Sequence, residues 1–295
     1  MSDGSVIIIG NFDGVHRGHV SLIKAAREAE PGAKLIAVTF WPHPWAIHHP
    51  DRVPPLLTTL DRRVELLRAA GVDEVVVVDY TLQFSRQSPA EFIDGTLRPL
   101  NPVRVVVGEN FRFGRDNSGD VHTLADLAGG DFKVQVQPLV GAGTTPNSAT
   151  MIRKAIAEGD LDRVREMSDQ VFRYTGIVVE GDHRGRELGF PTANVPVDPA
   201  LAVPADGVYA GWVTRLDIPS PRWPAAISVG TNPTFDGAER RIEAYVLDRT
   251  DLELYGVRIA IDFERRIRGQ VKYQGLEPLI EQMHRDVAQV RDLLA

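Results

Sequence analysis

Two histidines, His16 and His19, lie close together in the glycine-rich segment GNFDGVHRGH at 10–19. The segment follows a β-branched run and opens a helical pattern, which places it where ligands bind in open α/β folds. Imidazoles near a helix N-terminus can donate hydrogen bonds to phosphate oxygens, and such donors would stabilise the charge that builds up during nucleotidyl transfer. The alternative is a turn with two incidental histidines, which the strand before it and the helix after it disfavour.

A second segment, NSATMIR at 147–153, could contact a nucleotide. Ser148 or Thr150 can cap the helix that follows, and Arg153 lies within about its first turn, so that together they could clamp a triphosphate. The alternative is an ordinary N-cap, which we favour on this segment alone.

A third segment, GENFRFG at 108–114, interleaves Asn110 and Arg112 with two phenylalanines after a β-branched run. Such a loop could stack on a planar ring and hydrogen-bond its edge. Alternatively, the phenylalanines simply pack into the core.

The second half of the chain carries oxygen side chains in the segment FPTAN at 190–194. Thr192 and Asn194 lie two positions apart after a proline, so on an extended chain they face the same way. Oxygen ligands of this kind suit Mg²⁺, which keeps waters and shares substrate phosphates. Glu243 is a candidate base for a hydroxyl nucleophile. On this residue alone, however, we favour the alternative that it is a solvent-facing strand residue.

The elements that must position these residues alternate between strand and helix in the first half. Strands separated by helices indicate βαβ units and a mostly parallel sheet. The run VVVV predicts that strand 74–79 is buried on both faces, and Ser88, Pro89 and Glu91 form a capping box that begins a helix. Strands are predicted at 5–10, 34–40, 74–79, 103–107 and 133–137, and helices at 18–29, around the apolar repeat Leu60, Val64 and Leu67, from 88, at 150–157 and at 161–167.

The second half reads as an all-β domain followed by one helix. Its short alternating or apolar runs are separated by Gly, Pro, Asp and Asn, which predicts an antiparallel sheet or barrel. The runs lie at 176–180, 207–215, 225–229, 241–247 and 258–263, and the apolar stripe of the final helix is Leu279, Met283, Val287, Val290 and Leu294. We place the domain boundary near 168–172.

The composition excludes several classes of protein. A chain of 295 residues suggests two domains, and the absence of cysteine excludes disulfides, thiolate zinc, iron–sulfur clusters and a cysteine nucleophile. The net charge of −7 gives no broad basic surface for nucleic acid. The run at 6–9 is too short for a signal sequence or a membrane span. We therefore expect a cytoplasmic protein without nucleic-acid or membrane partners; whether it forms a homo-oligomer is left open.

Eight segments, in order along the chain, resemble the bacterial bifunctional riboflavin kinase/FAD synthetase family. They are GNFDGVHRGH at 10–19, TFWPHP at 39–44, VGENFRFG at 107–114, GRELGFPTAN at 185–194, GVYAGWV at 207–213, SVGTNPTF at 228–235, IEAYVLD at 242–248 and RIRGQVKY at 266–273. The resemblance covers nearly the whole chain. It implies an FMN adenylyltransferase domain at 1–168, with the Rossmann-like parallel sheet of the HxGH nucleotidyltransferases. It also implies a riboflavin kinase domain at 172–295, built on a six-stranded antiparallel barrel with a C-terminal helix.

The resemblance also implies substrates and residue roles. Riboflavin, FMN and ATP would be the substrates, with Mg²⁺ or a similar divalent cation as cofactor. For adenylyl transfer it implies His16 and His19 as catalytic residues, Gly10, Phe12, Asp13, Gly14, Ser148, Thr150 and Arg153 at the nucleotide, and Asn110 and Arg112 on the FMN side. For the kinase it implies Thr192 and Asn194 at the metal and phosphates, Glu243 as general base, and Arg268 in the segment on the flavin side.

Two departures from the family pattern leave alternatives open. The element at 148–150 reads Ser-Ala-Thr where the family usually has Ser-Ser-Thr, and 168–171 reads SDQV where it usually has a Leu-Gly-Arg-Pro-like tetrapeptide. One alternative is a divergent paralogue with one active domain or a changed substrate. The other is a non-catalytic flavin-binding protein, which the histidine pair and Glu243 disfavour.

Overall fold

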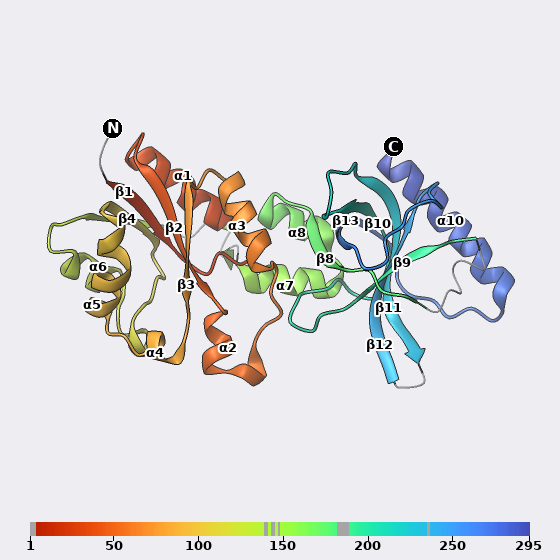
Figure 1. The fold of residues 1–295 in the computed structure, drawn as a ribbon, viewed down its shortest axis with the longest axis horizontal. Helices are drawn as coiled ribbons and strands as arrows, with labels where there is room; N and C mark the ends of the chain where they lie inside the picture. The colour runs from red at the N-terminus through yellow and green to blue at the C-terminus, as the bar shows by residue number, and fades with distance from the viewer. Residues whose placement is uncertain (1–3, 139–140, 143–144, 147, 182–188, 235–236) are drawn as a thin grey trace. The chain divides into compact units, whose positions relative to one another are not determined.

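The computed structural model describes residues 4–138, 141–142, 145–146, 148–181, 189–234 and 237–295 (Figure 1). The chain divides between Ala149 and Thr150 into two compact units. The boundary expected from the sequence lies further along, at 168–172, so two helices assigned to the first half belong to the second unit. No helix among the described residues is long and apolar enough to cross a membrane.

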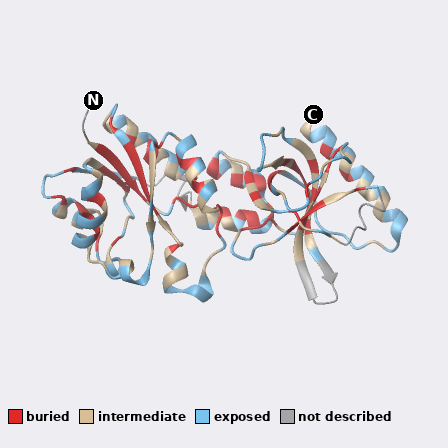
Figure 2. Ribbon diagram, in the orientation of Figure 1, coloured by how far each residue is buried: buried red, intermediate tan, exposed pale blue. Residues whose placement is uncertain are grey.

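The first unit is built on a five-stranded parallel sheet, as its alternating pattern predicts. The strands pair in the order β3-β2-β1-β4-β5, so β1 lies in the middle. Every residue of β1 is buried, because both faces of the sheet are covered there (Figure 2). The strands are β1 Ser5–Ile9, β2 Lys34–Trp41, β3 Glu74–Asp79, β4 Pro102–Gly108 and β5 Lys133–Gln137, and a separate small ladder joins β6 Gly141–Ala142 to β7 Thr145–Pro146.

Two apolar clusters hold helices against opposite faces of this sheet, because alternate residues of β1 point to opposite sides. Leu22 and Leu67, from α1 and α3, lie in one cluster, and Phe92 and Leu124, from α5 and α6, lie in the other. The capping box predicted before α5 is confirmed. The helices are α1 Arg17–Ala29, α2 Pro44–His48, α3 Leu60–Ala69, α4 Leu82–Ser85, α5 Pro89–Phe92 and α6 Val121–Ala128, with a π-helical turn at Ile93–Leu97 and 3-10 turns at Pro50–Arg52, Arg98–Leu100 and Arg115–Asn117.

The strand β3 is present as predicted, but the prediction that it is buried on both faces is wrong. It lies at the edge of the sheet, and its residues are half-buried or exposed, with Val77 at 39% exposure. A β-branched run indicates that a segment suits a pleated strand, but it does not determine where that strand lies in the sheet.

Two helices begin the second unit, and strands of the same unit hold them. The Arg266 guanidinium donates a hydrogen bond to the backbone oxygen of Glu158, at the end of α7, at 3.2 Å. Arg165 of α8 forms an ion pair with Glu264. These tertiary contacts are why both helices group with the second unit. Their bounds are α7 Ala149–Glu158 and α8 Leu161–Ser168.

A six-stranded antiparallel sheet makes up most of the second unit, with the order β8-β13-β10-β11-β12-β9. A bridge between Val179, just after β8, and Asn194 of β9 brings the two ends of the sheet together, so it curls into the expected barrel. Gly211 is required in this wall, because a Cβ atom there would collide with the backbone oxygen of Asp262. The strands are β8 Phe172–Ile177, β9 Thr192–Pro196, β10 Gly207–Arg215, β11 Trp223–Thr234, β12 Gly237–Val246 and β13 Arg258–Arg268.

The chain ends in α10, Leu276–Leu294, as its apolar stripe predicts. Val290 is fully buried and packs with Ala210. The helix also buries Asp286, whose carboxylate accepts hydrogen bonds from Arg268 Nε at 3.0 Å and Nη2 at 2.6 Å. This ion pair, which the apolar stripe does not indicate, anchors α10 to β13.

We expect Asp286→Asn to destabilise the second unit by about 3 kcal/mol, because Arg268 keeps its charge and loses the buried carboxylate that neutralises it. The matched control is Glu281→Gln, which breaks the exposed pair between Glu281 and Arg285 on the same helix and should leave stability unchanged. Urea unfolding of the two variants measures the difference, and equal stabilities would contradict an anchoring role for Asp286.

Two candidate active sites

The first candidate site lies at the carboxyl end of β1, where residues 10–16 lead into α1. This turn is tight, since Phe12, Gly14 and Val15 have positive φ angles of 49°, 80° and 38°. A side chain at Gly14 would also collide with Leu57, so the position requires glycine. The Phe12 side chain is fully buried, so it supports the loop from within the core.

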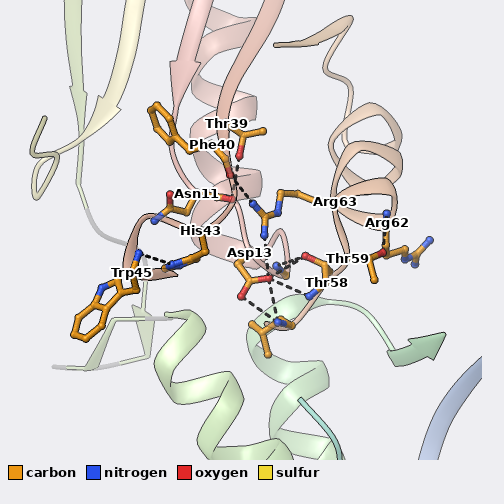
Figure 3. Close-up of polar contacts among 12 residues, drawn as sticks. Asn11, Asp13, Thr39, Phe40, His43, Trp45, Thr58, Thr59, Arg62 and Arg63 are labelled. Atoms are coloured by element: carbon orange, nitrogen blue, oxygen red, sulfur yellow. Dashed lines mark hydrogen bonds and ion pairs between the residues drawn. The ribbon is translucent and has the colours of Figure 1, made fainter. Parts of the chain in front are cut away.

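Asp13 is turned into the protein and is 2% exposed. Its carboxylate accepts hydrogen bonds from the backbone N–H groups of Leu57 and Thr58 and from the Thr58 hydroxyl, at distances of 3.0 to 3.1 Å (Figure 3). Asp13 therefore ties the glycine-rich loop to the segment that leads into α3.

The two histidines stack on each other, with ring centroids 3.7 Å apart and an angle of 22° between the planes. His16 directly precedes α1, and its side chain makes no capping hydrogen bond to the helix. The Nδ1 atoms of both rings are buried and have no hydrogen-bond partner among the residues that the structure describes. Buried polar atoms are nearly always hydrogen-bonded, so these positions suit a polar ligand.

Burial lowers the pKa of His16 from 6.5 to about 4, although the negative charge of Asp13 opposes the shift. The pKa of His19 is also lowered well below 6.5, first by burial and then by its electrostatic interactions with the neighbouring His16 and Arg63. Both rings are therefore neutral at neutral pH. A neutral imidazole still offers one N–H donor, so the pair can hydrogen-bond to phosphate oxygens as predicted.

Arg63, on α3, belongs to this site but is not singled out by the sequence. It is 0% exposed, and its Nη2 lies 3.6 Å from Asp13 Oδ1. Its Nη1 donates to the backbone oxygen of Phe40 at 3.5 Å (Figure 3). Its guanidinium also lies 5.5 Å from the centroid of the Trp41 ring. The available signal was its spacing of three from Leu60 in the apolar repeat of the helix, which places it near the buried side.

The structure places Asn110 and Arg112 on an exposed loop after β4. Arg112 donates a hydrogen bond to the backbone oxygen of Phe111 at 2.9 Å. Phe113 is buried, and Phe111 stacks on it with centroids 5.3 Å apart, so these phenylalanines pack onto the unit itself. Among the described contacts, neither Asn110 nor Arg112 touches the histidine pair.

The segment at 148–153 forms the start of α7. The helix begins at Ala149, so Ser148 occupies the N-cap position and Thr150 lies inside the helix. Arg153 follows one turn later and is half-buried. Asn147 lies outside the described residues. A role for this segment in nucleotide binding stays a prediction.

The second candidate site is a cavity of about 1100 Å³ in the second unit. A largely apolar cavity with a few polar groups is typical of sites for small molecules. Its apolar wall includes Phe190, Tyr245, Leu254, Leu279 and Met283. It is also lined by the four residues predicted for the kinase site, namely Thr192, Asn194, Glu243 and Arg268.

Strand pairing brings the polar residues of this cavity together. Glu243 of β12 pairs with Asn194 of β9 on one side and with Ser228 of β11 on the other, so the three side chains share a face. Asn194 Nδ2 contacts Thr192 Oγ1 at 3.5 Å, which confirms that Thr192 and Asn194 face the same way. Glu243 lines the cavity. This position disfavours the alternative interpretation that Glu243 is an ordinary solvent-facing strand residue. The first part of the segment at 185–194, residues 185–188, lies outside the described residues.

Arg268 reaches the cavity from β13, and its guanidinium is held by Asp286. This carboxylate raises the pKa of Arg268 above its ordinary value, so the arginine stays charged. Gln282 donates a further hydrogen bond to Asp286 at 2.9 Å. Gln270 also lines the cavity and donates to Ser228 Oγ at 3.2 Å. Sequence patterns do not single out Asp286 and Gln270, because their partners Arg268 and Ser228 lie on strands β13 and β11. Gln282 lies one turn before Asp286 on α10, and its role depends on that of Asp286.

We expect the His16 ring to titrate with a pKa of about 4 and to stay neutral between about pH 5.5 and pH 8. Because its pKa is lower in the folded state, the unfolded chain binds more protons between about pH 6.5 and pH 4, and the first unit loses stability as pH falls through this range. Histidine NMR titration measures the pKa, with His16→Ala to assign the signal. A midpoint near 6.5 would contradict the burial of this ring.

Comparison with known proteins also divides the chain into two parts, one in each half. Residues 1–151 match the family model described as FAD synthetase, and residues 168–294 match the model described as riboflavin kinase. The chain is 35% identical over 294 residues to the bifunctional riboflavin kinase/FMN adenylyltransferase of Listeria monocytogenes, covering 98% of this chain and 92% of that protein. It is 33% identical over 295 residues to the protein of the same name from Escherichia coli (strain K12), covering 98% of this chain and 93% of that protein.

A solved structure of similar fold carries a different title. The crystal structure of a macrolide-efflux protein from Streptococcus pneumoniae matches with a TM-score of 0.88 and 29% identity, covering 99% of this chain and 95% of that chain. That protein is named for efflux, whereas both family models and the two relatives are named for flavin enzymes. The parallel α/β unit and the six-stranded barrel agree with these two parts, and the chain belongs to the bifunctional riboflavin kinase/FMN adenylyltransferase family.

Proposed function

We propose that the chain makes FAD from riboflavin in two steps, with residues 172–295 phosphorylating riboflavin to FMN and residues 1–168 transferring AMP from ATP to FMN. The observation that supports this proposal is that each of the two compact units has its own cluster of polar side chains that suit phosphate chemistry. One unit presents a neutral histidine pair at the start of α1, and the other has a carboxylate among oxygen donors in a cavity.

In the kinase step, the terminal ribityl hydroxyl of riboflavin lies beside Glu243. The carboxylate accepts the hydroxyl proton as the oxygen attacks the γ-phosphorus of ATP, and ADP leaves. The apolar wall of the cavity takes the flavin ring, and the Arg268 guanidinium, fixed by Asp286, provides positive charge on the flavin side. Positioning and charge stabilisation supply most of the rate in such transfers.

The residues of this cavity fit a magnesium ion. Asn194 uses its Nδ2 group toward Thr192, which leaves Asn194 Oδ1 as an oxygen donor beside Thr192 Oγ1. These are hard oxygen ligands, and Mg²⁺ completes such a set with waters and substrate phosphates. When bound, the ion neutralises negative charge on the transferred phosphoryl group.

In the adenylyl transfer step, a phosphate oxygen of FMN attacks the α-phosphorus of ATP, and pyrophosphate leaves. His16 and His19 donate hydrogen bonds to the phosphate oxygens, and the positive end of α1 adds to this stabilisation. Gly10 and Gly14 allow the nucleotide to approach the backbone. In this proposal Ser148, Thr150 and Arg153 contact the triphosphate, and Asn110 and Arg112 contact FMN.

The substrates are small molecules, and since both steps consume ATP, we place the enzyme in the cytoplasm. We propose no nucleic-acid or membrane partner. The sequence differs from the usual family pattern at Ala149 and at 168–171. These differences favour one second candidate function, that of a paralogue which catalyses only one of the two steps.

We expect the pure protein to convert riboflavin first to FMN and then to FAD when ATP and Mg²⁺ are present. Chromatographic separation of the flavins over time measures both steps, and a reaction without Mg²⁺ serves as control. FMN that accumulates without FAD would support the single-activity paralogue. Tight flavin binding without any turnover would contradict both proposed reactions.

We expect His19→Ala and Glu243→Gln to remove different steps. His19→Ala should slow FAD formation from FMN by about 100-fold or more, and Glu243→Gln should slow FMN formation from riboflavin by a similar factor, because each removes a group that acts on the reacting atoms. The spared activity of each variant shows that the other unit is folded, and circular dichroism with thermal unfolding checks the unit that carries the substitution. His122→Ala and Glu277→Gln, both at exposed positions, are the matched controls.

A variant that loses both steps alike would contradict the division between the two units. A variant that loses neither step would remove that residue from the proposed chemistry.

A further inference from the structure

A buried positive charge lies behind the histidine pair of the first unit. Arg63 is 0% exposed, so its guanidinium cannot reach a ligand in solvent contact. Burying a charged group is costly unless it is paired, and a buried arginine therefore marks a place where the surrounding groups compensate it.

The glycine-rich loop and the end of β2 supply contacts that compensate this charge. The carboxylate of Asp13, on the glycine-rich loop, lies 3.6 Å from Arg63 Nη2. The carboxyl end of β2 provides the backbone oxygen of Phe40 and the face of the Trp41 ring. Arg63 itself comes from α3, whose first turn is capped by Thr59. Figure 3 shows the guanidinium pointing from α3 toward the loop and the strand end together.

The same contacts fix the loop from a second direction. Asp13 accepts hydrogen bonds from Leu57 and Thr58, and the Thr58 hydroxyl in turn accepts one from the backbone N–H of Gly14 at 3.3 Å. Arg63 therefore faces a carboxylate that already has its hydrogen bonds satisfied. The planar guanidinium of Arg63 contacts both Asp13 and the backbone oxygen of Phe40, and it thereby joins the loop to the end of β2.

The charge of Arg63 also acts on the histidine pair. It lowers the pKa of His19, in addition to the effects of burial and of His16. The charged groups that face this pair are then Asp13 and Arg63, one of each sign. Burial is the largest cause of the lowered His19 pKa, and the charge of Arg63 acts in the same direction. A neutral ring has one N–H donor and one acceptor.

We propose that Arg63 is a positioning residue for adenylyl transfer: through Asp13 and the end of β2 it holds in place the glycine-rich loop that leads to the histidine pair. This inference rests on the proposed adenylyltransferase activity of the first unit. Arg63 acts through its neighbours and does not contact the reacting atoms.

The test compares Arg63→Met with Arg63→Lys in the full-length chain. Arg63→Met removes the charge at similar length, whereas Arg63→Lys keeps the charge but cannot join Asp13 and Phe40 through one planar group. The matched control is Arg62→Met, which removes the neighbouring arginine whose partner, Glu65, lies on the same helix. Each variant is measured for kcat and KM of FAD formation from FMN, for FMN formation from riboflavin, and for the His19 pKa by NMR.

We expect Arg63→Met to lower kcat for FAD formation by about 10-fold to 100-fold, as small misplacements of a catalytic group do. The KM for FMN should stay within about threefold, FMN formation should be unchanged, and the pKa of His19 should rise toward 6.5. Arg63→Lys should keep the His19 pKa low and recover part of kcat. Arg62→Met should resemble the unchanged protein in every measurement.

Two results would overturn the proposal. One is a folded Arg63→Met protein with unchanged kcat, and the other is equal loss in both Arg63 variants with an unmoved His19 pKa, which would indicate a purely structural arginine. If Arg63→Met does not fold, Arg63→Gln carries the same test, because it removes the charge and keeps hydrogen-bonding groups for Asp13 and Phe40. The proposed function is tested separately, by measuring whether the unsubstituted protein forms FAD. If it forms none, the adenylyltransferase proposal fails, while the effect of Arg63 on the His19 pKa can still be measured.

Discussion

The buried carboxylate of Asp13 is the interaction on which the first site depends. It satisfies backbone N–H groups of Leu57 and Thr58, and it holds a loop in which Phe12 and Val15 have positive φ angles. Backbone strain of this kind costs roughly 1–3 kcal/mol for each residue and persists only where the surroundings fix it. The histidine pair follows directly on this loop, so its stacked arrangement depends on a carboxylate that is itself buried in the protein.

The second site depends on strand register in the same way. Glu243 lies beside Asn194 and Ser228 because β12 pairs with β9 and β11 in one register. A slip of one residue would turn Glu243 to the other face of the sheet. The cavity is closed on another side by α10, which the ion pair between Arg268 and Asp286 anchors. The histidine pair and the kinase cavity are therefore each positioned by tertiary contacts and strand register within one unit.

Local patterns predicted most elements of the fold, because a strand run or the capping box at Ser88 depends on residues close in the chain. The family resemblance predicted that Thr192, Asn194, Glu243 and Arg268 belong to one kinase site. In the structure all four line the same cavity. What could not be predicted depends on tertiary contacts: the edge position of β3, the grouping of α7 and α8 with the second unit, and the buried charges of Arg63 and Asp286. From the sequence alone a charged residue is predicted to be exposed, because charged residues are rarely buried without a partner. The partners of Arg63 and Asp286 lie on other elements, so no local pattern indicates them.

The neutrality of the stacked histidines has a consequence for product release. Pyrophosphate carries several negative charges, and unpaired cations buried beside it would attract it strongly where water does not screen them. Two neutral N–H donors stabilise charge through short-range hydrogen bonds, and the nearby Arg63 is already balanced by Asp13. In the proposed adenylyl transfer, such a site would stabilise negative charge while it forms and would hold the pyrophosphate less tightly than two unpaired cations.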